Sequence, residues 1–127
     1  MELFVPYFRL LEEGVAVDIA APEAGAIHGA PAAVRKVKKA QEIAQSFFAN
    51  DKPVASICHG PWLLVSADLV KGRRLTSYWH DGVTEEIKAA GCIYEDKEVV
   101  VDGNLVTSRW PMDLPAFVRE TIRLIKP

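Results

Sequence analysis

The stretch that most constrains the fold is residues 52–64, KPVASICHGPWLL. Its first half is a continuous run of small and β-branched apolar residues, which is typical of a strand buried on both faces of a parallel sheet. The run ends in Cys-His-Gly-Pro, and the apolar pattern then becomes helical. We therefore expect a strand that turns sharply into a helix, with Cys58 on the turn.

Predicted helices and strands alternate along the rest of the chain, and Asp102-Gly103 predicts a hairpin between two of the strands. Such alternation indicates a mostly parallel α/β sheet whose reactive groups gather at the carboxyl ends of the strands. The length of 127 residues predicts a single domain over 1–127. The apolar spacing predicts helices over 3–13, 31–49, 61–70, 82–90 and 113–125, strands over 15–20, 54–58, 73–79, 92–95, 98–101 and 104–108, and a loop over 21–30.

Charge and hydropathy exclude several classes of function. A net charge of -2 gives no electrostatic case for binding nucleic acid or an anionic membrane. No apolar run is long enough to span a membrane, and the sequence shows no signal-peptide pattern, so we expect a cytoplasmic protein. The helix predicted over 31–49 carries basic residues around its apolar face, which we interpret as a solvated surface. These basic residues are Arg35, Lys36, Lys38 and Lys39.

The cysteines and histidines do not form a structural framework. Two cysteines, Cys58 and Cys92, are too few for a set of disulfides and are typical of a protein with reduced thiols. The three histidines, His28, His59 and His80, lack the spacing of metal ligands. We therefore expect neither a metal nor another cofactor, and we interpret Cys92 as a core residue and His28 and His80 as exposed loop residues.

The predicted turn has the residues that thiol chemistry needs. Gly60 suits a tight turn, and Pro61 suits the first position of a helix. The N-terminus of that helix supplies free N–H groups and a partial positive charge, which favour a thiolate and form an oxyanion site. The alternative for Cys58 is an ordinary buried cysteine. For His59, a catalytic base and a turn histidine bonded to the backbone both remain open.

The motif KPVASICHGPWLL resembles the DJ-1/PfpI superfamily, and its PfpI-like branch in particular. The resemblance implies a flavodoxin-like three-layer sandwich that assembles as a homodimer or homohexamer. In the family, Cys58 matches the reactive cysteine of the turn, His59 its neighbouring histidine, and Glu2 the glutamate on the first helix that lies against the sulfur. The alternative for Glu2 is an exposed charge at a frayed end. Further similar stretches are LVKGRRLTSY, EIKAAG, EVVVDGNLVTSRWPMDLPAF and ELFVPYFRLLEEGVAVDIAAPE.

Two pieces of the family pattern have no counterpart in this sequence. One is the strand before the first helix, and the other is a strand with a Gly-Gly loop, expected after EAGAIHG, whose N–H groups are part of the family's oxyanion site. In PfpI-like members an acidic residue just after that loop reaches the histidine of a neighbouring subunit, and Ala32 occupies the corresponding place. Three explanations stay open: segments omitted from the sequence, a shortened chain that repacks or borrows strands, or a relative without catalysis. We favour the first because the remaining segments are intact.

The resemblance implies a cysteine-dependent hydrolase, deglycase or glyoxalase. In this reading Cys58 is the nucleophile, Glu2 its proton partner, and His59 an accessory base that also belongs, with Gly60, to the oxyanion turn. The expected substrate is a small reactive aldehyde or its adduct on a protein or peptide, and peptide hydrolysis is a further candidate. The alternative is a non-catalytic stress chaperone or a redox-sensing protein in which Cys58 is oxidised.

Overall fold

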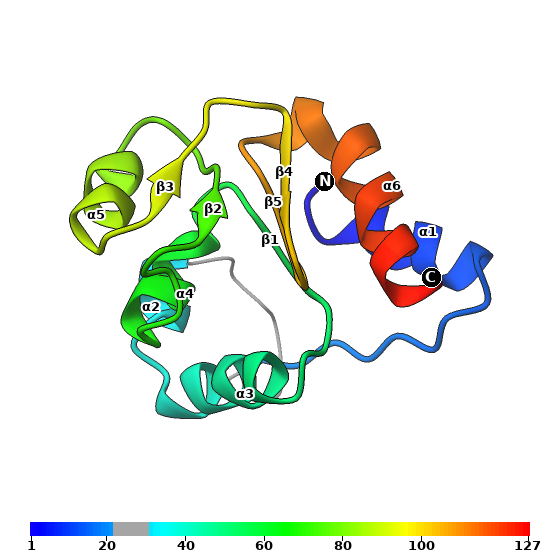
Figure 1. Ribbon diagram of the computed structural model, residues 1–127. Coiled ribbons are helices and arrows are strands. Elements are labelled where there is room, and N and C mark those ends of the chain that lie inside the picture. The colour runs from blue at the N-terminus through cyan, green and yellow to red at the C-terminus, as the bar shows by residue number, and fades with distance from the viewer. Residues whose placement is uncertain (22–30) are drawn as a thin grey trace.

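The computed structural model describes residues 1–21 and 31–127 and arranges them in three layers. Figure 1 shows a central sheet with α1 and α6 on one face and the helices α2 to α5 on the other. This arrangement confirms the predicted α/β sandwich with a mostly parallel sheet. The helices are α1 (Phe4–Glu12), α2 (Pro31–Val34), α3 (Lys38–Ala49), α4 (Pro61–Ser66), α5 (Val83–Ala89) and α6 (Leu114–Ile125), with a 3-10 turn, η1 (Pro111–Asp113).

The sheet has three strands in the order β1-β5-β4. Strand β1 (Val54–Ile57) runs parallel to β5 (Leu105–Ser108), and β4 (Val99–Asp102) forms an antiparallel hairpin with β5. A second, short parallel pair joins β2 (Arg74–Leu75) to β3 (Ile93–Tyr94). The predicted strand and the predicted hairpin are therefore confirmed, but β1 is not buried on both faces as expected: among its residues only Ser56 is buried, and Ala55 is exposed.

Two apolar cores lie on opposite faces of the sheet, and β5 contributes to both. Leu105 faces the core formed with α3, α4 and α5, whereas its neighbour Val106 faces the core formed with α6. This follows from the strand geometry, because successive side chains point to opposite faces. Helix α6 places Leu114, Phe117 and Val118 on one side at helical spacing, and all three are buried against the sheet.

The strand predicted over 15–20 is wrong. These residues follow α1 without regular secondary structure, and the side chain of Ile19 is exposed. An extended segment becomes a strand only when a neighbouring strand takes up its N–H and C=O groups, and no described strand pairs with this segment. The composition of residues 15–20 is typical of a strand, but it does not show whether a neighbouring strand is present to pair with them.

The helix predicted over 31–49 is interrupted. It forms as α2 and α3, separated by an extended backbone at Val37 with φ -78° and ψ 109°. Arg35, expected on a solvated face, instead donates hydrogen bonds to Ser66 and to the Glu86 carboxylate. The Glu86 carboxylate raises the pKa of Arg35, which ties this interhelical segment to α4 and α5.

Two smaller differences concern the ends of elements. The helix predicted over 61–70 ends at Ser66, and the strand predicted over 73–79 pairs only at Arg74–Leu75. Nearly all of the loop predicted over 21–30 lies outside the described residues. In the described part of the chain, no helix is both long enough and apolar enough to cross a membrane.

Candidate active site

Cys58 lies directly after β1 on a sharp turn into α4. Its backbone is left-handed, with φ 62°, a conformation that costs a non-glycine residue about 1–3 kcal/mol. Both of its peptide groups are hydrogen-bonded: its N–H donates to the carbonyl of Ser108 in β5 at 3.0 Å, and its C=O accepts from the N–H of Tyr78, which follows β2, at 3.0 Å. The strained turn predicted from the sequence is therefore present, with Cys58 partly buried rather than exposed.

Gly60 is required by contacts inside the turn. A Cβ at this position would lie 2.5 Å from Ser56 Oγ and 2.9 Å from the Ile57 carbonyl oxygen, closer than real Cβ atoms come. The sequence predicted a glycine here to avoid neighbouring strands, but the atoms that exclude a side chain belong to the end of β1 itself. Pro61 follows at the start of α4, as expected.

His59 bridges the thiol and a carboxylate. Its Nδ1 lies 3.1 Å from Cys58 Sγ, and its Nε2 lies 3.0 Å from Asp81 Oδ2. One neutral tautomer satisfies both contacts, with Nε2–H donating to Asp81 and the Nδ1 lone pair facing the thiol. Adjacent residues in a turn commonly point apart, so the sequence did not show whether His59 touches the thiol. In the structure the two side chains are in contact.

Aromatic side chains fix the plane of the His59 ring. The ring packs edge-on against Trp62 at 5.1 Å between centroids and lies 4.9 Å from the ring of Tyr78. The His59 side chain is 21% exposed, whereas the Asp81 side chain is 64% exposed. The imidazole is thus held within the protein while its carboxylate partner faces solvent.

Asp81 is the site residue that sequence reasoning missed. It lies between β2 and α5, with a left-handed backbone (φ 59°), and Gly82 after it is also left-handed (φ 76°). The available signal was the Asp-Gly pair that follows the predicted strand ending near residue 79, because strand ends gather at one edge of a parallel sheet. Ala32, at the place where the family pattern has its acidic residue, is exposed.

The environment of Cys58 favours the thiol over the thiolate. Burial is the largest cause, and the nearby charge and hydrogen bond of Glu2 add to it, so that the pKa of Cys58 is raised to about 12. The N–H of His59 acts in the opposite direction but is outweighed. The sequence predicted a net stabilisation of the thiolate by the helix N-terminus, and that prediction is wrong in sign.

Glu2 lies close to the thiol, as the family resemblance implies. Its carboxylate hydrogen-bonds Cys58, and Glu2 also lines a groove that runs along β1 past His59 and Gly60. The structure therefore brings together all four predicted site residues, Cys58, His59, Glu2 and Gly60, and adds Asp81. A thiolate forms in such a site when a neighbouring base removes the thiol proton. The Nδ1 lone pair of His59 is placed to accept this proton.

The remaining cysteine lies apart from this site. Cys92 packs against the core on the α5 side of the sheet, and burial raises its pKa. His80 is exposed, and His28 lies outside the described residues. Within 1–21 and 31–127, no group of three or more His, Cys, Asp or Glu side chains is arranged to hold a metal ion.

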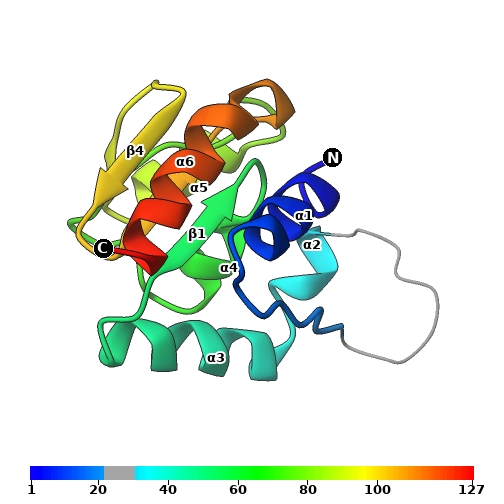
Figure 2. The ribbon, with the colours of Figure 1, turned by 90° about the vertical axis from the view of Figure 1, so that its right-hand side faces the viewer.

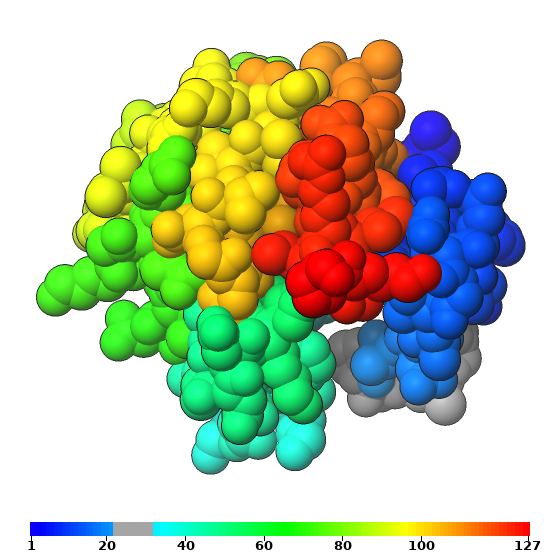
Figure 3. Space-filling model, turned by 45° about the vertical axis from the view of Figure 1, so that its right-hand side comes forward, coloured from blue at the N-terminus to red at the C-terminus, as the bar shows by residue number. Residues whose placement is uncertain are grey.

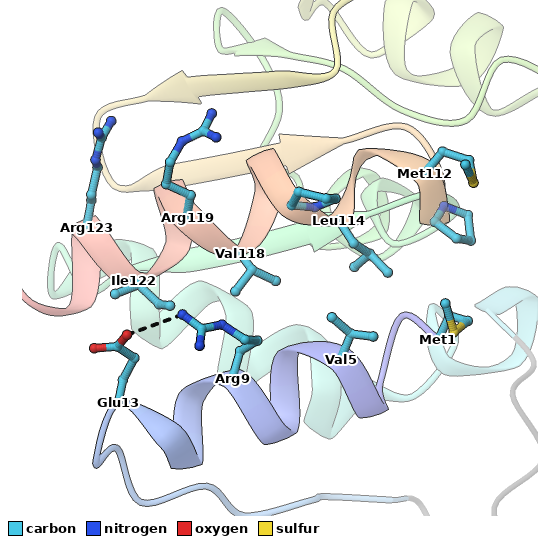
Figure 4. Close-up of a pocket in the computed structure, with 12 residues that line it drawn as sticks. Met1, Val5, Arg9, Glu13, Met112, Leu114, Val118, Arg119, Ile122 and Arg123 are labelled. Carbon is cyan, nitrogen blue, oxygen red and sulfur yellow. Dashed lines mark hydrogen bonds and ion pairs between the residues drawn. The ribbon is translucent and has the colours of Figure 1, made fainter.

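A larger cavity, of about 760 Å³, lies elsewhere, between α1 and α6. The two helices lie side by side in the space-filling view, α1 in blue and α6 in orange and red (Figure 3). Apolar side chains such as Val5, Val118 and Ile122 line the cavity (Figure 4). Three arginines also line it, and one of them, Arg9, is paired with Glu13 at 3.3 Å. No thiol or imidazole lines this cavity, so the candidate chemistry belongs to the turn at Cys58 and to the smaller groove that Glu2 and His59 line.

Comparisons with known proteins agree with this geometry. The model of the DJ-1/PfpI family matches residues 28–124. Deglycase PfpI of Pyrococcus furiosus is 43% identical over an alignment covering 99% of this chain and 92% of that protein. Protein/nucleic acid deglycase 2 of Escherichia coli is 51% identical over 64% of this chain, which corresponds to 46% of its own length.

A solved structure gives the same result. A two-domain protein from Anabaena variabilis, with a DJ-1/ThiJ/PfpI-like and a ferritin-like domain, matches with a TM-score of 0.72 and 34% identity. The match covers 76% of this chain and 27% of that one.

The alignment with the Pyrococcus furiosus deglycase is 155 positions long, although this chain has 127 residues. The alignment therefore passes over a stretch of that relative that has no counterpart here.

Proposed function

Because the chain belongs to the DJ-1/PfpI family, we propose that it is a cysteine-dependent deglycase, which removes aldehyde adducts from protein amines. The observation that carries this proposal is the contact series from Cys58 Sγ through His59 to Asp81, with distances of 3.1 Å and 3.0 Å. Relatives named deglycase support the same class of reaction. Peptide hydrolysis uses the same attacking sulfur and is the next candidate.

The proposed reaction begins with proton transfer. His59 takes the thiol proton through Nδ1, and Asp81 stabilises the imidazolium that forms. A thiol whose pKa is about 12 is ionised only at the moment of attack, so the base is required rather than accessory. Glu2 is the proposed proton partner on the other side of the sulfur. It keeps the resting group protonated through its charge and hydrogen bond.

The covalent steps balance with water as the only co-reactant. For an adduct of a 2-oxoaldehyde, Sγ bonds to the carbon that carries the amine, the C–N bond breaks, and the amine leaves with the proton from His59. Transfer of hydrogen from that carbon to the adjacent carbonyl carbon oxidises the first carbon, reduces the second, and leaves a thioester. Water then hydrolyses the thioester to a 2-hydroxy acid and the free thiol.

The test compares the two cysteines. The substrate is Nα-acetyl-lysine treated with methylglyoxal, and the measured product is the free lysine side-chain amine. We expect Cys58→Ala to abolish its formation, while Cys92→Ala keeps activity within about twofold of the unsubstituted protein. Amine release and 2-hydroxy acid formation are both measured, since the balanced reaction yields them in equal amounts. Full activity in Cys58→Ala would exclude this mechanism.

A second candidate function rests on a different surface. Helix α1 exposes Phe4 (60%) and Phe8 (63%), which lie one turn apart, together with Leu11. Exposed apolar rows of this kind bind unfolded clients, as a stress chaperone does. If this is the function, Phe4→Gln/Phe8→Gln will lose the ability to suppress aggregation of reduced insulin in light scattering, and Cys58→Ala will retain it.

A further inference from the structure

Arg35 joins three helical segments outside the candidate active site. It follows α2, and only 18% of its side chain is exposed. Its Nε donates to Ser66 Oγ at 2.9 Å, while the two other guanidinium nitrogens donate side by side to the Glu86 carboxylate, one of them at 2.9 Å. Gln41 Nε2 donates to the Arg35 carbonyl at 2.7 Å. Both the backbone and the side chain of Arg35 are therefore held in place.

The Arg35 guanidinium also lies over an aromatic ring. Its Cζ is 5.3 Å from the centre of the Trp62 ring, which is the distance of a cation–π contact. Trp62 and Ser66 are four residues apart on α4, so they lie on the same side of that helix and meet Arg35 together. Figure 2 shows α2 beside α4, as this contact requires.

Glu86 acts on both of these side chains. Arg35 is the main cause that holds the pKa of Glu86 below its usual range, and the nearby Trp62 N–H adds to it. This N–H is buried and forms no hydrogen bond of ordinary length. The position of the indole therefore depends on how its ring is packed rather than on its N–H.

The other neighbour of the Trp62 ring is the imidazole of His59. The two ring centroids are 5.1 Å apart, and the ring planes meet at 60°. The same imidazole contacts Cys58 through Nδ1 at 3.1 Å and Asp81 through Nε2 at 3.0 Å. A rotation of the imidazole would break both contacts at once. Trp62 thus connects the Arg35 guanidinium to the side chain whose orientation matters most for the site.

We propose that Arg35 and Glu86 position the base of the candidate active site. Their ion pair holds the Trp62 indole, and the indole holds the His59 imidazole between the thiol and Asp81. This deepens the proposed function, on which it rests for its chemistry, because it assigns control of the base to two residues that touch no reacting group. A bidentate arginine–carboxylate pair fixes the plane of the guanidinium, and small displacements of a catalytic group are costly for the rate.

The alternative is that the ion pair only joins the helices, and a second arginine provides the matched control. Arg73 lies over the Phe48 ring at 5.1 Å and pairs with Asp102 at 2.8 Å. Asp102 is at the hairpin turn beside the start of β1, whereas Cys58 follows the end of β1. Removal of Arg73 therefore costs the same kinds of contact at the opposite edge of the sheet.

The first measurement is the order of the His59 ring, which needs no substrate. The full chain is labelled with carbon-13 at the histidine rings, relaxation of the ring carbons gives order parameters, and the His59 signal is assigned by its loss in His59→Gln. We expect an order parameter of about 0.85 in the unsubstituted protein and a fall toward about 0.6 in Arg35→Leu. Arg73→Leu should leave the value unchanged.

The second measurement separates positioning from substrate binding. Arg35→Leu should lower kcat for amine release at least about tenfold and keep KM within about twofold, since a misplaced base slows proton transfer without removing a substrate contact. Glu86→Gln should act in the same direction by a smaller factor. Arg73→Leu should change neither constant.

Trp62 supplies a rescue experiment. Trp62→Leu removes the ring between Arg35 and His59 and should lower kcat as Arg35→Leu does. Trp62→Phe keeps an aromatic ring there and should retain kcat within about threefold, because a phenyl ring still packs against the imidazole. Where Arg35→Leu loses its native circular dichroism, Glu86→Gln and the two Trp62 variants decide instead.

Several results would overturn the proposal. These are an unchanged order parameter of His59 in folded Arg35→Leu, an equal fall in Arg73→Leu, or a rise in KM at constant kcat. Equal kcat in Trp62→Leu and Trp62→Phe would also overturn it.

The two proposals fail separately. A loss of His59 order in Arg35→Leu, without any deglycation by the unsubstituted protein, contradicts the proposed function alone. Deglycation that Arg35→Leu leaves unchanged contradicts only the positioning role of the ion pair.

Discussion

The two cysteines of this chain have similar burial but different surroundings. Both thiols are partly buried, and burial raises the pKa of each. At Cys58 the left-handed backbone falls on the cysteine itself (φ 62°), whereas beside Cys92 the preceding Gly91 takes it (φ 88°). Glycine adopts that conformation without steric cost, so the strain is concentrated at only one of the two thiols.

The side chains around the two thiols differ further. Cys58 has the imidazole of His59 at 3.1 Å, and the Glu2 carboxylate acts on its thiol through charge and a hydrogen bond. Cys92 lies among core residues, and Lys88 is the charged group that acts on it. The comparison teaches that burial alone does not identify a reactive cysteine, because backbone strain and a base within reach separate the two.

The largest expected effect comes from removing the base beside Cys58. His59→Ala should lower the rate of amine release by about 10²–10⁴-fold, the usual contribution of a general base. Lys88→Ala, which removes the charged neighbour of Cys92, is the matched control and should leave the rate unchanged. Steady-state assays of both variants check this, and similar losses in both would contradict the distinction between the two cysteines.

The next effect concerns alkylation of the thiols. A pKa of about 12 leaves Cys58 ionised to roughly one part in a thousand at pH 9, where free cysteine is mostly ionised, so iodoacetamide should label Cys58 on the order of a thousandfold more slowly. Peptide-resolved mass spectrometry follows the rate from pH 7 to 11, where it should still be rising.

Glu2 gives this measurement its internal control. Because the Glu2 charge and hydrogen bond raise the thiol pKa, Glu2→Gln should shift the Cys58 labelling curve to lower pH, while Glu12→Gln at the other end of α1 leaves it in place. A labelling rate that levels off below pH 8.5 in the unsubstituted protein would mean that the thiolate is the resting state.

A smaller effect is expected from the carboxylate beyond His59. Asp81→Asn keeps the left-handed backbone accessible but removes the charge that stabilises the imidazolium, so we expect a loss of about tenfold in kcat. Asp68 is also left-handed and exposed, with φ 58°, and Asp68→Asn should have no effect. Because the Asp81 charge also raises the pKa of Cys58, the pH profile should shift to lower pH in Asp81→Asn but not in Asp68→Asn.

The smallest effect is on stability and compares the glycine next to each cysteine. Gly60→Ala forces a Cβ against Ser56 Oγ and the Ile57 carbonyl, and overpacking of this kind costs about 1–3 kcal/mol of unfolding free energy. The Cβ added by Gly91→Ala would contact only Lys71 Cγ, at 3.4 Å. Its cost, about 1 kcal/mol of unfolding free energy, comes from the positive φ at this position. Urea unfolding of both variants checks the order, and a larger loss at Gly91 would reverse the argument.

Local sequence was enough to predict the turn at Cys58. The apolar strand, the glycine and the proline are all short-range requirements of one strand-to-helix connection, so residues 54–61 carry the whole pattern, although β1 is less buried than expected. The hairpin at Asp102-Gly103 and helix α6 were predictable for the same reason. Each depends on a turn or an apolar stripe that is complete within its own segment.

Features that depend on distant partners could not be predicted in this way. Residues 15–20 have the composition of a strand, but the pattern does not show whether a neighbouring strand is present to pair with them. Arg35 reaches Glu86 across 51 residues, and Asp81 reaches His59 across 22. The sign of the Cys58 pKa shift also escaped prediction, because it depends on how burial and Glu2 outweigh the N–H of His59.

The contact between His59 and Asp81 has a consequence for how activity depends on protein concentration. Both residues belong to the same chain, and their contact forms when that chain folds. A carboxylate supplied by a neighbouring subunit would leave the histidine whenever the subunits dissociate, and the activity per chain would then fall on dilution. Dilution cannot remove the Asp81 carboxylate from His59, so under the proposed mechanism we expect no loss on dilution of the activity that depends on this contact.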